Sequence, residues 1–334
     1  MFKLTFCDSG VQSEVNRFLA EWHDDKDYIV AHTSGSTGAP KEIRLPKADM
    51  RLSARATNLR LNITENSRLF CPLSVGYIAG KMMIVRALEA DCELGLCTPS
   101  NSFMDSSAVE KFMQEGAVGL VAVVPSQAKI LLVVQGVVRN VIIGGAPISP
   151  ELEMELVAHG NSATHFYATY GMTETCSHVA LRQLGSEEYR AMEGVKFAVD
   201  RRGCLKIIAP RYSFKELQTN DVVALLPGSD TAFRWLSRYD NVINSGGVKL
   251  YPEKIEAKLA PYVPYPFYIK GVPHEKWGTG VCLVFEHPDS DSSREHISAL
   301  KAICREHLDG YEVPVQYCQR KQFRHTASGK LLRD

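Results

Sequence analysis

The sequence predicts an α/β fold: a large N-terminal domain with mostly parallel sheets flanked by helices, followed by a small, mobile α+β domain. Between residues 119 and 170, apolar runs alternate with helical patterns, which is typical of buried parallel strands joined by helices. Past residue 240 the pattern changes to short strands and separate helices, which indicates a second core. We therefore expect one domain over residues 1–239, a second over residues 240–334, and a hinge at Asp240.

The first third of the chain is expected to surround a polar loop. Apolar residues at helical spacing predict a helix that ends near Trp22, and an apolar strand follows at residues 28–31. Residues 46–60 predict a helix with lysine and arginine on its outer face, and residues 78–88 predict an apolar helix. The loop at residues 32–41 thus follows directly from a strand.

The middle of the chain supplies the predicted sheet, and the last part supplies the small domain. Strands are expected at residues 119–124, 141–143 and 164–170, with helices between them at residues 126–134 and 150–158. In the small domain we expect helices at residues 252–260 and 294–308, and strands at residues 267–271 and 280–285. Ligands of parallel sheets bind beyond the carboxyl ends of the strands, so the segments after residues 143 and 170 are candidate binding loops.

Composition and charge exclude several classes of function. Lysine plus arginine and aspartate plus glutamate both number 38, so the formal charge is zero and no overall field attracts nucleic acid or a membrane surface. No apolar run reaches membrane-spanning length and the N-terminus lacks an apolar signal region, which predicts a cytoplasmic protein. The 9 cysteines contain no Cys-x-x-Cys pair and the 10 histidines show no ligand spacing, so we expect reduced, mostly buried thiols and no protein-caged metal.

A loop rich in glycine and hydroxyl groups follows the first predicted strand. Its glycines let the backbone approach a ligand closely, and its hydroxyls, amides and lysine suit phosphate oxygens. The residues concerned are Thr33, Ser34, Gly35, Ser36, Thr37, Gly38 and Lys41. The spacing Gly-x-x-Gly-x-x-Lys differs from that of P-loop NTPases, so their mechanism is not implied. A flexible serine and glycine linker is the alternative, although linkers seldom end in Pro-Lys between apolar segments.

Four further motifs follow this loop. They are Tyr170-Gly171-Met172-Thr173-Glu174, the aspartate of Thr219-Asn220-Asp221, the segment from Arg238 to Glu256 that contains Asp240 and Ser245-Gly246-Gly247, and the terminal Ser328-Gly329-Lys330. In this order, and together with the loop, they resemble the motifs of the acyl-adenylating (ANL) superfamily, which contains acyl-CoA synthetases, adenylation domains of peptide synthetases and luciferases. The resemblance covers the chain from residue 28 to its end.

The resemblance implies a two-step reaction. A carboxylate attacks the α-phosphate of ATP to give an acyl adenylate and pyrophosphate, and the thiol of coenzyme A then takes the acyl group. An anionic nucleophile must therefore approach a polyanion, and two unit charges about 4 Å apart repel by about 4 kcal/mol near a protein surface. Cations and hydrogen-bond donors must offset that repulsion. ATP, Mg²⁺ and coenzyme A are the expected ligands.

The same resemblance implies a role for each motif residue. The loop and Lys41 would hold the β- and γ-phosphates, with Glu174 as the magnesium ligand and Thr173 at the α-phosphate. The residues that would contact the nucleotide are Gly144, Gly145 and Ala146 at adenine, Asp221 and Arg238 at the ribose, and Tyr170 and Gly171 of the Tyr-Gly-Met-Thr-Glu motif. Lys330 would bridge the carboxylate and the α-phosphate in the first step. After a rotation at Asp240, Gly246 and Gly247 would shape a tunnel for the thiol.

Each assignment has a structural alternative. Glu174 is also a carboxylate that a helix N-terminus would attract, and Asp221 is also a common turn residue. Arg238 is also a candidate for a surface ion pair, and Lys330 for a solvated charge on the tail. The joint order of the motifs favours the functional interpretation. Cys176 is expected to be a small core residue, because the implied chemistry needs no enzyme thiol.

Two departures from the family pattern narrow the range of candidate substrates. The large N-terminal region ahead of the loop is nearly absent, so we expect a compact ligase. After Pro72-Leu73, many relatives have an aromatic residue and a histidine that gate the substrate site, whereas this chain has Ser74-Val75-Gly76-Tyr77. Tyr77 is the candidate replacement for that gating residue. The segment at residues 72–88 resembles a branch of the superfamily whose members activate an aromatic dicarboxylic acid, and the second carboxylate of such an acid needs a cation.

Arg86, in an otherwise apolar helix, is the first candidate for that cation, and Lys81 is the second. An arginine whose head reaches solvent from a helix end is the alternative. Three hypotheses about function stay open: a CoA ligase for an aromatic dicarboxylate or another aryl or acyl acid, an adenylation protein that loads a carrier-protein phosphopantetheine, and a nucleotide-binding module without catalysis. No nucleic acid or membrane partner is expected, and an oligomer is compatible with the sequence.

Overall fold

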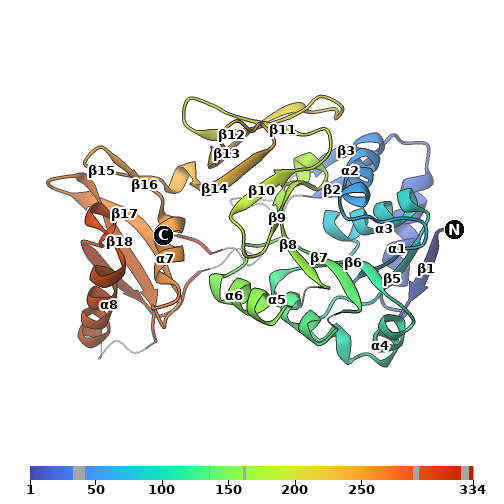
Figure 1. Ribbon diagram of the computed structural model, residues 1–334, viewed down its shortest axis with the longest axis horizontal. Coiled ribbons are helices and arrows are strands. Elements are labelled where there is room, and N and C mark those ends of the chain that lie inside the picture. The colour runs from blue at the N-terminus through green and yellow to red at the C-terminus, as the bar shows by residue number, and fades with distance from the viewer. Residues whose placement is uncertain (33–41, 135, 161–162, 289–292, 325–330, 334) are drawn as a thin grey trace. The chain divides into compact units, whose positions relative to one another are not determined.

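The structure, a computed structural model, describes residues 1–32, 42–134, 136–160, 163–288, 293–324 and 331–333 (Figure 1). These residues form two compact units. The first unit comprises Met1–Phe197, Ile207–Leu217 and Pro227–Phe233. The second unit comprises Ala198–Lys206, Gln218–Leu226 and Arg234–Asp334.

A large mixed sheet forms the centre of the first unit. Its strands follow the order β1 (Lys3–Phe6), β5 (Glu93–Leu96), β4 (Arg68–Cys71), β6 (Val118–Val123), β7 (Val138–Ile143), β8 (His165–Gly171), β9 (His178–Gln183) and β10 (Glu188–Ala191). Neighbours from β1 to β8 are parallel, whereas β9 is antiparallel to β8 and β10 is antiparallel to β9. The order continues with four strands whose residues are divided between the units: β14 (Ala232–Arg238), β13 (Lys215–Leu225), β12 (Cys204–Ala209) and β11 (Lys196–Val199).

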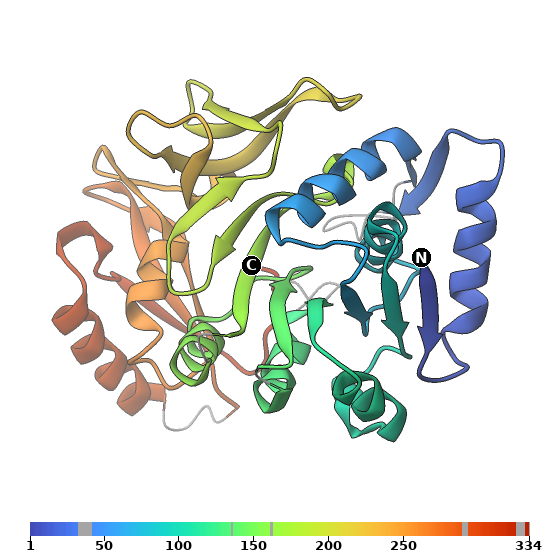
Figure 2. The same cartoon turned by 45° about the vertical axis from the view of Figure 1, so that its right-hand side comes forward.

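Helices cover both faces of the parallel part of this sheet. Figure 1 and Figure 2 show α2 (Lys47–Arg60) and α3 (Ile78–Ala90) over one face, with α4 (Ser107–Gln114), α5 (Pro125–Ala128) and α6 (Pro150–His159) over the other. Phe70 of β4 and Val121 of β6 pack with Phe112 of α4 in the core on the α4 side. Helix α1 spans Gln12–His23, and short 3-10 helices span Phe103–Asp105, Lys129–Val134 and Thr173–Thr175.

Helix α3 is apolar except at Lys81, Arg86 and Glu89, and most of it is buried. A helix without a continuous polar face belongs in the interior of a fold. Its first turn lies against the backbone that follows β4, because a Cβ at Gly80 would collide with the carbonyl oxygen of Ser74. Glycine thus allows α3 to lie close to the end of β4, and this position carries Arg86 into the interior.

Strands β2 (Tyr28–His32) and β3 (Glu42–Pro46) pair antiparallel in a sheet of their own, with His32 opposite Glu42. The predicted strand at residues 28–31 is therefore confirmed, although it does not join the main sheet. The candidate phosphate loop connects these two strands in the sequence, and its residues 33–41 lie outside the described residues.

The second unit has its own sheet and core. Strands β17 (Phe267–His274) and β18 (Gly278–Glu286) pair antiparallel, and β19 (Gln316–Arg320) joins β18 in parallel. The core of this unit contains apolar residues of α7 (Pro252–Leu259) and α8 (Ser293–His307), such as Ile255 and Leu300. A hairpin of β15 (Ile243–Ser245) and β16 (Val248–Leu250) and the 3-10 turns Tyr239–Asn241 and Gly310–Glu312 complete it.

The predicted α/β class is confirmed, with two differences of detail. The sheet of the first unit is mixed, because β9 and β10 run antiparallel after the parallel strands. The helix expected at residues 126–134 is a short α5 followed by a 3-10 segment. The division at residue 240 and the mobility of the small domain remain predictions, since the second unit also contains residues 198–206 and 218–226.

The state of the cysteines and the length of the helices can be compared with the predictions from the sequence. All 9 cysteines lie in the described part of the chain as free thiols, and 7 of them are buried. This agrees with the expectation of reduced, mostly buried thiols. No described helix is both long enough and apolar enough to span a membrane.

Candidate active site

Two loops at the carboxyl ends of β7 and β8 lie side by side. Ile143 ends β7, and its carbonyl oxygen accepts a hydrogen bond of 3.2 Å from Thr169 Oγ1 near the end of β8. A Cβ at Gly144 would collide with that hydroxyl, so a side chain is excluded there. Gly145 has a φ of 84°, a left-handed conformation that favours glycine. The structure thus brings Gly144, Gly145 and Ala146 next to the motif at the end of β8.

The turn after β8 also requires glycine. A Cβ at Gly171 would collide with the carbonyl oxygen of Ser177, which lies across the turn. The 3-10 helix Thr173–Thr175 completes this turn. Thr173 is half-buried and Glu174 is exposed, so the two predicted catalytic residues of the motif border solvent at the same edge of the sheet.

Glu174 is the carboxylate that this turn offers to a metal ion. Within the described ranges, no group of three or more histidine, cysteine, aspartate or glutamate side chains is arranged to hold one. Mg²⁺ in nucleotide sites is typically bound by one or two carboxylates together with substrate phosphates and water. The donor set at the turn therefore fits a magnesium ion that arrives with ATP.

Tyr170 is anchored by an aromatic cluster. The centroid of its ring lies 5.1 Å from that of Phe233 and 5.8 Å from that of Tyr189, in edge-on arrangements. The rings of Tyr189 and Phe233 stack at 5.3 Å. Aromatic pairs of this kind contribute about 0.5–1.5 kcal/mol each beyond the area they bury. The cluster therefore fixes the strand end that carries Thr173 and Glu174.

Arg86 reaches the same turn from α3. The residue is 2% exposed, and its Nη2 donates a hydrogen bond of 2.6 Å to Ser177 Oγ. Its Nη1 lies 3.6 Å from Met83 Sδ, and its Nε has no hydrogen-bond partner among the described residues. The backbone carbonyl of Arg86 accepts a bond of 2.9 Å from Asn58 Nδ2 on α2. The structure thus places the predicted substrate cation directly behind the Tyr170–Glu174 motif.

The guanidinium of Arg86 carries an unpaired charge. In the part of the chain that the structure describes, no carboxylate lies within ion-pair distance of it; the neighbouring ionisable group that acts on its pKa is the Cys71 thiol. Burial lowers the pKa of Arg86 to about 10, so the side chain stays protonated at neutral pH. Burying a cation without a partner costs several kcal/mol, on the order of 3–5 kcal/mol. A buried cation without a carboxylate partner among the described residues is a candidate anion site. The burial of Arg86 excludes the alternative of an arginine head in solvent.

Sequence patterns do not identify the polar residues around Arg86. Ser177 and His178 follow the β8 turn directly, so their position after a recognised motif was a usable signal. Thr57 of α2 gave no signal, because it meets His178 across 121 positions of the sequence. Burial, together with the charge of Arg86, holds the pKa of His178 well below its usual value, so its ring is neutral.

Lys81 and Tyr77, the other predicted substrate residues, lie apart from Arg86. Lys81 Nζ lies 3.6 Å from Glu21 Oε2 and 5.1 Å from the centroid of the Phe18 ring, both on α1. It lines a separate pocket of about 420 Å³. Tyr77 is 67% exposed. Because Lys81 already has a carboxylate partner, the geometry favours Arg86 as the free cation.

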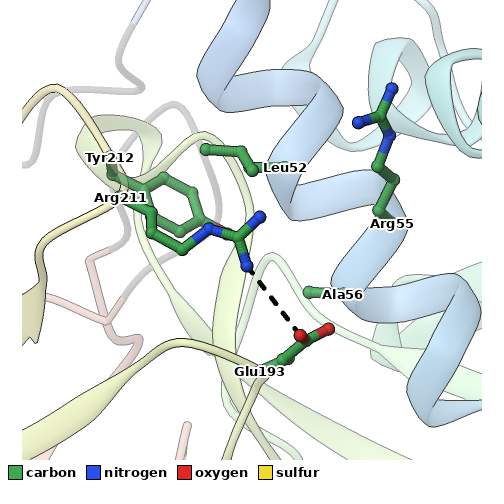
Figure 3. A pocket seen from close by; sticks show the side chains of 6 residues that line it. All are labelled: Leu52, Arg55, Ala56, Glu193, Arg211 and Tyr212. Atoms are coloured by element: carbon green, nitrogen blue, oxygen red, sulfur yellow. Dashed lines mark ion pairs between the residues drawn. The ribbon is translucent and has the colours of Figure 1, made fainter.

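A second pocket of the first unit contains arginines that are already paired. It has a volume of about 110 Å³ and is lined by Leu52, Arg55, Ala56, Glu193, Arg211 and Tyr212 (Figure 3). Arg211 Nη1 lies 3.8 Å from Glu193 Oε1, and Arg55 Nε lies 2.6 Å from Glu89 Oε2. Since carboxylates already balance both guanidiniums, this pocket is a weaker candidate for an anionic substrate than the surroundings of Arg86.

In the second unit, Asp221, Arg238 and Asp240 form a charged cluster. Arg238 Nη1 lies 3.6 Å from Asp221 Oδ1, and its Nη2 lies 3.7 Å from Asp240 Oδ2. Asp221 is buried, and its backbone N–H donates a bond of 3.1 Å to Thr219 Oγ1. The structure thus brings together the two predicted ribose residues and the predicted hinge residue, and their roles remain predictions.

Gly246 and Gly247 form the turn between β15 and β16. Their φ values of 58° and 86° are in the left-handed region, which favours glycine. A Cβ at Gly246 would come within 3.0 Å of the Tyr311 ring and 3.3 Å of the Trp277 ring. The turn therefore lies tightly against an aromatic wall, and its role in a thiol tunnel remains a prediction.

The other predicted ligands lie outside the described residues. They are Thr33, Ser34, Gly35, Ser36, Thr37, Gly38, Lys41 and Lys330. Their roles in phosphate binding and catalysis remain predictions from the sequence.

Several relatives share most of this chain. It is 27% identical over 345 residues to the 2-succinylbenzoate–CoA ligase of Listeria monocytogenes, an alignment that covers 95% of this chain and 71% of that one. The crystal structure of an acyl-CoA synthetase (AMP-forming)/AMP-acid ligase II-like protein from Dyadobacter fermentans is 33% identical, with a TM-score of 0.63 and coverage of 97% and 93%. The o-succinylbenzoate CoA synthetase of Bacillus subtilis, in complex with its acyl-adenylate intermediate, matches at 22% identity, a TM-score of 0.74 and coverage of 91% and 67%, which shows the fold alone.

The family follows from these motifs and from a match over more than half of the chain. Residues 8–199 match the AMP-binding enzyme family, and the chain belongs to it. Its class of activity is that of an ATP-dependent acid–CoA ligase that forms an acyl-AMP intermediate. The predicted membership of the acyl-adenylating superfamily is thereby confirmed.

Proposed function

We propose that the protein converts 2-succinylbenzoate, ATP and coenzyme A into 2-succinylbenzoyl-CoA, AMP and pyrophosphate, in menaquinone biosynthesis. This acid is an aromatic compound with two carboxylates, so one carboxylate stays free while the other is activated. Support comes from the relatives of that name, at 27% identity in the case of Listeria monocytogenes. Support also comes from the buried guanidinium of Arg86, which has no carboxylate partner among the described residues.

The choice of substrate depends on one observation: the Arg86 guanidinium is buried and has no carboxylate partner among the described residues. A guanidinium recognises a carboxylate with parallel N–H donors, and such charge-assisted bonds are about twice as strong as neutral ones. Among the described residues, the buried Nε–H of Arg86 has no hydrogen-bond partner, so this donor is left unsatisfied. A monocarboxylic acid has a single carboxylate, which reacts with the α-phosphate of ATP. Arg86 would then stay buried without a carboxylate partner. A dicarboxylic acid satisfies both requirements.

The first half-reaction needs positive charge where the acid meets ATP. Thr173 would donate its hydroxyl to an α-phosphate oxygen, and the loop with Lys41 would contact the β- and γ-phosphates. Lys330 would bridge the attacking carboxylate and the α-phosphate, which offsets their repulsion. Glu174, together with the phosphates, would hold a magnesium ion, which would supply positive charge beside the phosphates.

The nucleoside would be held by residues that do not take part in the chemistry. The Asp221 carboxylate would accept hydrogen bonds from the ribose hydroxyls, with Arg238 beside it. Gly144 and Gly145 would leave room for the flat adenine ring. In the second half-reaction, a rotation at Asp240 would bring the β15–β16 turn to the thiol of coenzyme A, which displaces AMP from the acyl group.

A panel of acids, scored for AMP formation with and without coenzyme A, tests this proposal. The panel contains 2-succinylbenzoate, its two monocarboxylic analogues that each lack one carboxylate, benzoate and medium-chain fatty acids. We expect 2-succinylbenzoate to give the highest kcat/KM, by about tenfold or more over either analogue. We also expect a soluble acyl-CoA to form when coenzyme A is present.

The other outcomes separate the competing hypotheses. A monocarboxylic acid that reacts as well as 2-succinylbenzoate would contradict the proposed substrate. Acid-dependent AMP formation without any soluble acyl-CoA would favour a carrier-protein acceptor. No acid-dependent AMP formation with any member of the panel would favour a nucleotide-binding module without catalysis.

A further inference from the structure

Three polar side chains connect Arg86 to helix α2. Arg86 Nη2 lies 2.6 Å from Ser177 Oγ, which lies 3.4 Å from Nδ1 of His178. Nε2 of His178 lies 3.1 Å from Thr57 Oγ1, and Thr57 Oγ1 lies 3.0 Å from the carbonyl oxygen of Ser53. Thr57 and His178 are buried. The contacts therefore form a chain that runs from a helix carbonyl to the guanidinium, and we call its members Thr57, His178 and Ser177 the relay.

The direction of each hydrogen bond in the relay can be assigned. A carbonyl oxygen only accepts, so Thr57 donates its hydroxyl proton to Ser53 O. Thr57 Oγ1 must then accept from Nε2–H of His178, which leaves Nδ1 without a proton because the ring is neutral. Nδ1 can accept the hydroxyl proton of Ser177, and a lone pair of Ser177 Oγ accepts from Arg86. The relay is therefore uncharged along its whole length.

An uncharged support has a clear consequence for Arg86. A carboxylate at the position of Ser177 would pair with the guanidinium and would compete with any anionic ligand. A charged histidine would repel the guanidinium, whereas the neutral ring does not. The relay thus fixes the orientation of Arg86, and no carboxylate among the described residues balances its positive charge.

We propose that Thr57, His178 and Ser177 are positioning residues that hold the Arg86 guanidinium for the unactivated carboxylate of the acid. They thereby set the preference of the ligase for dicarboxylic over monocarboxylic aromatic acids. This inference rests on the proposed function, since it needs Arg86 to bind that carboxylate. It adds three residues that no sequence motif of the family brought into the site.

Two relay variants and one matched control test this inference in the full-length enzyme. Ser177→Ala removes the acceptor of Arg86, Thr57→Val removes the acceptor of His178 with little change of shape, and Thr57→Ser keeps the hydroxyl. For each, kcat/KM for AMP formation is measured with 2-succinylbenzoate and with the monocarboxylic analogue that the wild type activates. The ratio of the two values is the selectivity.

We expect Ser177→Ala to lower the selectivity by about tenfold or more, because it removes a hydrogen bond to a charged group. Thr57→Val should lower it by about threefold to tenfold, since its effect passes through His178. Activity with the monocarboxylic analogue should stay within about twofold of wild type in both variants, which also reports that they fold. Thr57→Ser should keep the selectivity of the wild type.

The contrary outcomes have distinct meanings. Equal losses with both acids would identify a structural role and overturn the inference, as would a loss of selectivity in Thr57→Ser that matches Thr57→Val. Unchanged selectivity in Ser177→Ala and Thr57→Val, beside a complete loss of selectivity in Arg86→Met, would overturn the relay and leave the proposed function intact. A wild-type enzyme without any preference for the dicarboxylic acid would contradict the proposed function itself, and the relay with it.

Discussion

Replacement of Lys330 by alanine is expected to lower the rate of acyl-adenylate formation by about a hundredfold or more. The ammonium group would otherwise lie between the attacking carboxylate and the α-phosphate, where it offsets the repulsion of two anions. The transfer of the acyl group from pre-made adenylate to coenzyme A should change little, because the anhydride bond between the carboxylate and the α-phosphate has already formed at that stage. Single-turnover assays of the two half-reactions measure each rate separately.

A matched control for this experiment is Lys321→Ala, which removes an exposed lysine of the second unit. It should leave both half-reactions unchanged, because an isolated surface charge contributes little. If Lys330→Ala slowed both half-reactions equally, the role of Lys330 in the first step would have to be abandoned.

Replacement of Arg86 by methionine is expected to change activity and stability in opposite directions. The value of kcat/KM for 2-succinylbenzoate should fall by about a hundredfold, since the free carboxylate loses its cation. The free energy of unfolding should rise by about 1–4 kcal/mol, because an apolar side chain of similar length replaces a buried charge without a carboxylate partner. Urea unfolding and steady-state kinetics on the same preparation measure the two effects.

Arg55→Met serves as the matched control, since Arg55 is largely exposed and already paired with Glu89. Its effect on stability should stay within about 1 kcal/mol, and its activity should not change. A charge-reversing Arg86→Glu variant with an unchanged KM for 2-succinylbenzoate would remove the argument for this substrate. A large loss of stability in Arg86→Met with activity retained would show that Arg86 is a structural residue.

Much of the fold follows from local patterns in the sequence. The period of apolar residues predicted α1 and α2, and the alternation of apolar runs with helical patterns predicted β6, β7 and β8. The sequence patterns did not identify residues 178–183 as a strand, so the antiparallel pairing of β9 with β8 across a short turn was not predicted. The patterns identified β2 as a strand but did not identify its partner β3, so the separate sheet of these two strands was not predicted either.

The candidate site was predictable only in part. Glu174 and Gly171 lie in a continuous motif, so their type and spacing identify them. Arg86 was conspicuous as a charge in an apolar helix. That no described carboxylate pairs with it is a property of the folded chain, which the sequence pattern does not show. Ser177 directly follows the recognised motif, which was a usable signal. Thr57 is a common polar residue whose contact with His178 joins different elements, and sequence alone gave no reason to select it.

A crystal structure of the protein with AMP and 2-succinylbenzoate, or with a stable analogue of their acyl adenylate, tests the central claim most directly. The account predicts that the unactivated carboxylate lies within hydrogen-bond distance, about 3 Å, of the Arg86 guanidinium. A complex in which that carboxylate faces solvent or pairs with another cation, while Arg86 keeps only its bond to Ser177, would contradict it.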